Sequence, residues 1–206
     1  MARLSMVFLT ALVLAPTAAS AGVLKLYGEG RGGGMYGKGL AGDQKDQSFF
    51  QKSKGGAYGV AVGAQFLIFD AHIKHMQYFT DGLSTWTQFD GGLDFMVDTG
   101  SEEDKKAHKG GYLEIGAFIG FGVGTGAQVM PPLDNSEVTD KGFFLEGQLG
   151  FGKHLNNIFD IGVTVPVSWG YLFKSGAGAT ANNMSDQYQS VQVDVLLVLR
   201  ANIKFI

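Results

Sequence analysis

The last twenty residues of the chain, Gln187 to Ile206, alternate between two kinds of side chain with a period of two. The odd positions from Val191 to Phe205 are all apolar, whereas the even positions include Asp194, Arg200 and Lys204. This is the period of a β-strand, because successive side chains of a strand point to opposite faces. A globular strand has about five or six residues, whereas a strand that crosses a bilayer needs roughly 9–11. The alternation therefore predicts a strand long enough to span a membrane.

The start of the chain has the pattern of a secretory signal peptide. Arg3 provides a short basic opening, residues 5–16 are mostly apolar, and Ala19-Ser20-Ala21 matches a small-residue cleavage site. The apolar run is shorter than the about 20 residues that a membrane-spanning helix needs. We therefore predict that residues 1–21 are a signal peptide and that residues 22–206 form one domain.

Composition narrows the class of protein. The chain has no cysteine, which excludes a disulfide framework and a thiolate metal site. The net charge is −3, and −4 without Arg3, which argues against a nucleic-acid partner. No apolar segment after residue 21 is long enough for a helical span. If the protein lives in a membrane, it must therefore be a closed barrel, in which all backbone polar groups are paired.

Alternation and turn signals divide residues 22–206 into eight expected strands. Residues 31–56 and 126–141 are predicted as long loops, residues 99–111 as a charged connector, and Asp70-Ala71 as a tight turn. Pro166 has no N–H for the ladder and predicts a bulge. Which face of the third strand is polar stays open, because Lys74 and His75 are adjacent. The expected strands are 22–30, 58–68, 72–80, 85–98, 112–123, 143–151, 159–169 and 187–206.

An even number of strands lets an antiparallel barrel close with both chain ends on one side. Connections after the first, fifth and seventh expected strands are long and those after the second and sixth are tight, as in outer-membrane barrels. With these features, and with Phe205 near the end of its closing strand, the sequence resembles the small outer-membrane β-barrels of the OmpA and OmpW types. The resemblance implies an all-β, eight-stranded antiparallel transmembrane barrel with up-and-down meander topology. It also implies the outer membrane of a Gram-negative bacterium, with both termini in the periplasm.

The partners that this resemblance implies are those of an envelope protein. They are outer-membrane lipid and lipopolysaccharide, the barrel-assembly machinery, which reads the terminal aromatic of the last strand, and other envelope proteins. The expected functions are a structural or complex-forming role, a narrow pore for small solutes or, least favoured, an enzyme that acts on lipid. No motif nominates a catalytic residue, a cofactor site or a metal site, so we expect no catalysis and no cofactor.

The faces of the strands distinguish a membrane barrel from a secreted, lipocalin-like ligand-binding barrel, which would place its apolar face inward. Glycines gather on the polar face, as a narrow eight-stranded interior favours, at positions 59, 63, 116, 120, 122, 150, 152 and 162. Aromatic residues of the apolar face lie near strand ends, as in a membrane girdle. These are Phe151, Phe159 and Phe205 at one end and Trp169 and Tyr171 at the other. Trp86 has the wrong parity for this girdle. The pattern favours the membrane barrel.

The polar face predicts a network of charges inside the barrel. Parity directs six charged side chains into the half of the lumen nearest the chain termini. Because an unpaired buried ion is far costlier than a paired one, we expect them to form a cross-lumen salt-bridge network that plugs the barrel. The six are Lys25, Asp94, Glu114, Asp160, Arg200 and Lys204.

Overall fold

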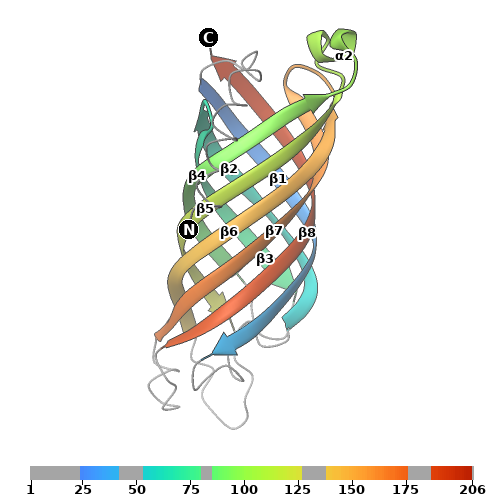
Figure 1. Cartoon of the computed structure of the whole chain (residues 1–206). Coiled ribbons are helices and arrows are strands. Elements are labelled where there is room, and N and C mark those ends of the chain that lie inside the picture. The colour runs from blue at the N-terminus through green and yellow to red at the C-terminus, as the bar shows by residue number, and fades with distance from the viewer. Residues whose placement is uncertain (1–23, 42–52, 80–84, 127–137, 176–186, 206) are drawn as a thin grey trace, which may run out of the picture.

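The computed structural model describes residues 24–41, 53–79, 85–126, 138–175 and 187–205. Eight antiparallel strands form a closed barrel, in which each strand pairs with its sequence neighbours and β1 pairs with β8 (Figure 1). This confirms the predicted up-and-down, eight-stranded barrel. The strands are β1 (Leu24–Ala41), β2 (Ser53–Phe66), β3 (Phe69–Phe79), β4 (Thr85–Thr99), β5 (Gly111–Gly126), β6 (Val138–His154), β7 (Phe159–Ser175) and β8 (Gln187–Phe205).

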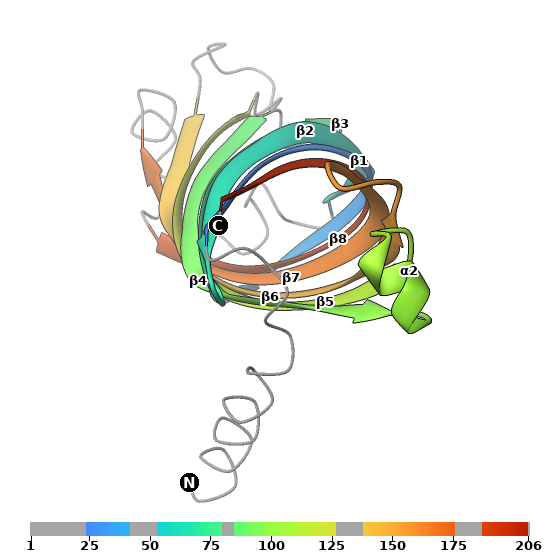
Figure 2. The same cartoon turned by 90° about the horizontal axis from the view of Figure 1, so that it is seen from above.

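The strands are steeply tilted (Figure 1) and form a ring around the barrel axis (Figure 2). The tilt follows from the register. Starting at Leu24 and moving from each residue to its partner on the next strand, the path returns to β1 at Tyr36. The barrel thus closes with a stagger of twelve residues. Strand number and stagger together set the tilt and the diameter of a barrel, so this large stagger widens the lumen enough to hold rows of large side chains.

The first two strands are longer than predicted. β1 continues to Ala41 and β2 begins at Ser53, so much of the segment predicted as a loop, residues 31–56, is strand. Four outward positions in the middle of β1 are glycine, at 28, 30, 32 and 34, and they hide the apolar alternation. Hydrogen bonding to β2 and β8 overrides the low strand propensity of glycine.

The turn between β2 and β3 lies earlier than predicted. Leu67 and Ile68 form it, with Leu67 at a φ of 56°, and the predicted turn at Asp70-Ala71 is wrong. Asp70 is a common turn residue, but here it is buried within β3 and accepts a hydrogen bond of 2.9 Å from the Tyr27 hydroxyl. The structure also settles the facing of β3: Lys74 points inward and His75 outward.

Two further expectations are corrected. Pro166 creates no bulge: pairing of β7 with β8 is interrupted at Val165 and Pro166, but Thr164 and Val167 pair with Leu196 and Val193 in one register. Because Pro166 also keeps its partner on β6, its missing N–H affects the β8 side alone. The second loop prediction, residues 126–141, overlaps β6, which begins at Val138.

The connector between β4 and β5 contains a short exposed helix, α2 (Glu102–Lys106). Ser101 caps it: the Ser101 hydroxyl donates to the Asp104 carboxylate at 2.7 Å and accepts from the Asp104 amide at 3.1 Å. These hydrogen bonds hold the pKa of the Asp104 carboxyl below its usual range. The helix lies at the end of the barrel where β1 begins and β8 ends (Figure 1).

The two faces of the wall differ in the way expected of a membrane barrel. Large apolar side chains such as Ile119, Leu149 and Leu197 are about 60% exposed on the outside, whereas carboxylates, amides and cations line the inside. A lipocalin-like barrel would have the reverse arrangement, so that alternative does not fit. Trp86, which had the wrong parity for the outer face, is indeed buried inside. Among the described residues no helix is long and apolar enough to span a bilayer.

Candidate functional site: the lumen of the barrel

An arginine bridges the lumen in the half nearest the termini. Arg200, on β8, contacts Glu29 on the adjacent β1 through Nε. Its Nη2 donates to both oxygens of Glu114 on β5, at 2.8 and 3.0 Å. On β1, Arg31 continues this series of contacts, because its Nη2 lies 2.5 Å from Glu29 Oε2. Because β5 lies four strands away from β1 around the barrel, these contacts cross the lumen.

A second chain of polar contacts starts on β3. His72 lies between two carboxylates, with Nδ1 2.7 Å from Asp70 and Nε2 3.3 Å from Asp90 on β4. Lys74 lies 3.3 Å from the same Asp90 and 2.5 Å from Glu146 on β6. These side chains are at most 9% exposed. Together, these two series of polar contacts connect strands on different sides of the barrel across the lumen.

The structure brings together only part of the predicted set of six. Arg200 and Glu114 pair directly. Asp160 is next to Arg200 in the register but contacts His154 and Asn202, at 2.6 Å each. Asp94 is buried, and its Oδ1 has no hydrogen-bond partner among the described residues.

The two lysines of that set lie outside the network. Lys25 is half-buried, with Nζ 5.4 Å from the centre of the Tyr27 ring. Lys204 is exposed, although Lys25 and Lys204 are cross-strand partners. Neither forms an ion pair with another described residue. Lys204 stands at the open end of the barrel, where its exposed ammonium group reaches water.

Sequence reasoning missed most of the network. Glu29, Asp90 and Glu146 have the parity of the polar face and were identifiable by the same count. Arg31 lay in the segment mistaken for a loop, and Lys74 on the strand whose facing stayed open. The odd or even position of a residue along its strand was thus the available signal. It failed where a strand boundary was misplaced or where the facing of a strand stayed open.

The other half of the lumen is filled by apolar and aromatic side chains. Trp86 and Phe144 pack edge to face with their ring centres 5.1 Å apart. Leu172 is fully buried, and Tyr188, 1% exposed, donates a hydrogen bond of 2.5 Å to Asp140. These side chains belong to one buried cluster: Met35, Ala57, Met76, Tyr78, Trp86, Phe144, Leu172, Tyr188, Leu196 and Val198.

Inward glycines make room for these rings. A Cβ on Gly122 would lie 2.3 Å from the Trp86 ring, and one on Gly124 would lie 2.1 Å from it. A Cβ on Gly170 would lie 2.5 Å from Phe144. A protein interior has no spare space of this kind, so the glycines are required for ring packing. The inward glycines, which suit a narrow lumen as predicted, thus leave the space that the large side chains occupy.

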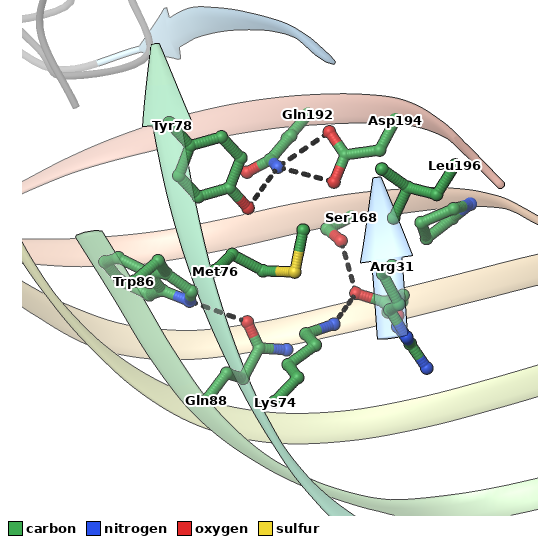
Figure 3. Close-up of a pocket in the computed structure, with 12 residues that line it drawn as sticks. Arg31, Lys74, Met76, Tyr78, Trp86, Gln88, Ser168, Gln192, Asp194 and Leu196 are labelled. Atoms are coloured by element: carbon green, nitrogen blue, oxygen red, sulfur yellow. Dashed lines mark hydrogen bonds and ion pairs between the residues drawn. The ribbon is translucent and has the colours of Figure 1, made fainter. Parts of the chain in front are cut away.

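A small cavity lies between the two halves. Its volume is about 10 Å³, and it lies beside Lys74, Gln192 and Asp194 (Figure 3). Gln192 Nε2 donates to the Tyr78 hydroxyl at 3.0 Å and to Asp194 at 2.8 Å. These hydrogen bonds connect β3 and β8 beside the cavity. A cavity of this size holds about one water molecule. It is not a passage for a solute.

At the mouth nearest the termini, His154 lies between Asp160 and Asp98, with Nδ1 2.6 Å and Nε2 3.1 Å from their carboxylates. This clamp joins β4, β6 and β7, and the Asp98 side chain is 31% exposed. Among the described residues no group of three or more histidine, cysteine or acidic side chains is arranged to hold a metal ion. Within the described part of the chain, these charged side chains contact one another through ion pairs and hydrogen bonds.

Comparisons with known proteins bear on the fold. Among solved structures, the barrel is similar to Neisserial surface protein A, with a TM-score of 0.54 and 10% identity, over 87% of this chain and 97% of that one. The chain has the fold of the small eight-stranded outer-membrane barrels. The outer membrane protein OprG from Pseudomonas aeruginosa gives a TM-score of 0.37 and 11% identity, over 90% of this chain and 97% of that one. No family model and no curated protein sequence matches the chain.

Proposed function

We propose that this protein is a closed, integral outer-membrane barrel with a structural or complex-forming role, and that it carries out no catalysis. The observation that carries the proposal is the combination of an apolar outside and a filled inside. Lipid replaces water around the outer face, and the packed lumen gives solutes no path.

The size of the apolar outer face fits a bilayer. On β6, the outward lysines Lys141 and Lys153 bracket an uninterrupted run of apolar or glycine positions, 143 to 151. Twelve residues at about 3.3 Å each, on a strand tilted by roughly 45°, span about 28 Å along the barrel axis. This is close to the hydrocarbon thickness of a membrane, about 30 Å. The rims of the band therefore coincide with charged side chains that reach water.

The orientation follows from the same architecture. The end that holds both termini also holds the two shortest connections, at residues 67–68 and 155–158, together with the longer connection at residues 100–110. Barrels of this class keep short turns on the periplasmic side. We infer that both termini face the periplasm and that the opposite end faces outward.

The test combines location with permeability. The full-length protein is expressed with its amino-terminal segment, the cells are fractionated, and the product is run boiled and unboiled on a denaturing gel. We expect recovery with the outer membrane and faster migration when unboiled. Proteoliposomes that contain the purified barrel should not swell in isosmotic sugar or amino-acid solutions. Recovery from the soluble periplasm would refute the membrane location, whereas solute-dependent swelling would refute the closed lumen and favour the narrow pore.

A further inference from the structure

Polar side chains interrupt the apolar outer face at one place, on β3 and β4. His75, Gln77 and Thr87 point outward there. On the other six strands, the described outward positions between the two rims carry only apolar, aromatic or glycine residues. A polar side chain that faces lipid is energetically costly, so its presence there indicates a functional role.

These polar groups lie deeper than the interface. Phe79 and Tyr58 stack with ring centres 5.4 Å apart near the rim opposite the termini, in the position of a membrane girdle. His75 precedes Phe79 by four residues, which places it about 9 Å deeper, at about 3.3 Å per residue and a tilt of roughly 45°. His75 and Thr87 are therefore on the hydrocarbon side of the girdle.

Part of this hydrogen-bonding capacity is unused within the described residues. His75 Nδ1 and Thr87 Oγ1 form a hydrogen bond of 2.7 Å. The other ring nitrogen of His75 and the side-chain amide of Gln77 have no partner in the described part of the chain. In hydrocarbon, an unpaired amide or imidazole is energetically costly, because no water replaces the missing hydrogen bond. A molecule that supplies hydrogen-bonding groups at this depth would be stabilised here.

Cations lie on the rim above the patch. Gln77 pairs in register with Tyr58, and four residues nearer the rim on β2 is exposed Lys54. Lys54 is next to Tyr36 on β1, two residues from exposed Lys38. From rim to membrane interior, the surface thus offers positive charge, then aromatic rings beside Gln77, then His75, then apolar Val62 and Ile73, which pair across β2 and β3. This order matches a phosphate, a linker with amide, ester or hydroxyl groups, and an acyl chain.

We propose that the outer face of β2 to β4 is a binding site for a phosphate-bearing, acylated lipid. Lys38 and Lys54 hold the phosphate, His75 and Gln77 bind the amide, ester or hydroxyl groups at the start of the acyl chains, and Thr87 orients the His75 ring. The inference rests on the proposed membrane location and goes beyond it, because it assigns one side of the barrel to one lipid.

The test is native mass spectrometry of the refolded full-length barrel in detergent, titrated with diphosphorylated lipid A or with a galactosyl diacylglycerol that has no phosphate. We expect lipid A to bind with a stoichiometry of one and the neutral glycolipid to bind at least tenfold more weakly. His75→Leu combined with Gln77→Leu, and Lys38→Gln combined with Lys54→Gln, should each raise the Kd for lipid A about tenfold. Lys141→Gln, at the same rim above apolar Phe143 and Leu145, should leave it within twofold.

Each alternative outcome overturns the site. Equal binding of both lipids, or equal binding by all variants, would show an ordinary lipid annulus. A two-chain mass that the His75/Gln77 variant abolishes would show a second copy of the chain as the occupant. The leucine substitutions place apolar groups on an apolar face, so the variants should fold, and gel mobility that changes on boiling verifies this. A barrel that folds and inserts but binds no lipid A refutes the site and leaves the proposed function intact.

Discussion

The two halves of the lumen are filled by different chemistry. Near the termini, Arg200, Glu29 and Glu114 hold the wall together with charge-assisted hydrogen bonds, whereas toward the other end Trp86 and Phe144 pack on glycine. The first kind of filling depends on every partner being present, because one missing charge leaves another buried and unpaired. The second depends on volume and tolerates loss in proportion to the cavity made. We therefore propose that the lumen is closed twice, by a different means in each half.

The largest effect is expected in the charged half. Arg200→Ala leaves Glu29 and Glu114 buried without their shared partner and should lower the free energy of unfolding by about 3–5 kcal/mol. Adding Glu114→Ala removes one of the stranded charges, so the double variant should cost less than the sum of the two singles. Urea unfolding in lipid vesicles measures all three variants. Strictly additive losses would mean that the Arg200–Glu114 pair is not coupled.

A smaller effect is expected in the apolar half. Leu172→Ala should cost about 2–4 kcal/mol, because a fully buried side chain is replaced by a cavity. Leu172→Met, which conserves volume, should cost less than about 1.5 kcal/mol. Unfolding midpoints in low and high salt separate this half from the other: the Leu172 variants should show the salt response of the wild type. If the Leu172 variants changed the salt response as much as Arg200→Ala does, the proposed difference in chemistry between the two halves would be wrong.

The smallest effect is expected at the mouth. Asp98 contacts His154, but its side chain is 31% exposed, so water screens the pair. Asp98→Asn should therefore cost no more than about 1 kcal/mol, well below the loss for Arg200→Ala. The two values, measured under one set of urea conditions, give the dependence of ion-pair strength on depth in the lumen. If Asp98→Asn lowered the free energy of unfolding as much as Arg200→Ala does, ion-pair strength would not depend on depth in the lumen.

Much of this architecture could be predicted from the sequence, because the period of two records which side of the wall each residue faces. Long alternations such as residues 112–123 and 191–205 therefore predicted both the strands and their facing. Prediction failed where the signal was erased: outward glycines made much of β1 look like a loop, and Asp70 imitated a turn. The Arg200–Glu114 pairing was within the predicted set, but other pairings across the lumen, such as Lys74 with Glu146, could not be predicted, because they depend on the twelve-residue stagger, which no local pattern encodes. The predicted signal peptide, residues 1–21, lies outside the described residues and remains a prediction.

The most direct test of the double closure is the conductance of the purified barrel in planar lipid bilayers. Wild type should show no steady conductance, and neither should Arg200→Ala or Phe144→Ala alone, because each single variant retains the other closure. Combining the two substitutions should open stepwise, ion-conducting events. A wild-type barrel that conducts steadily, or a single substitution in one half that opens the path fully, would contradict the account.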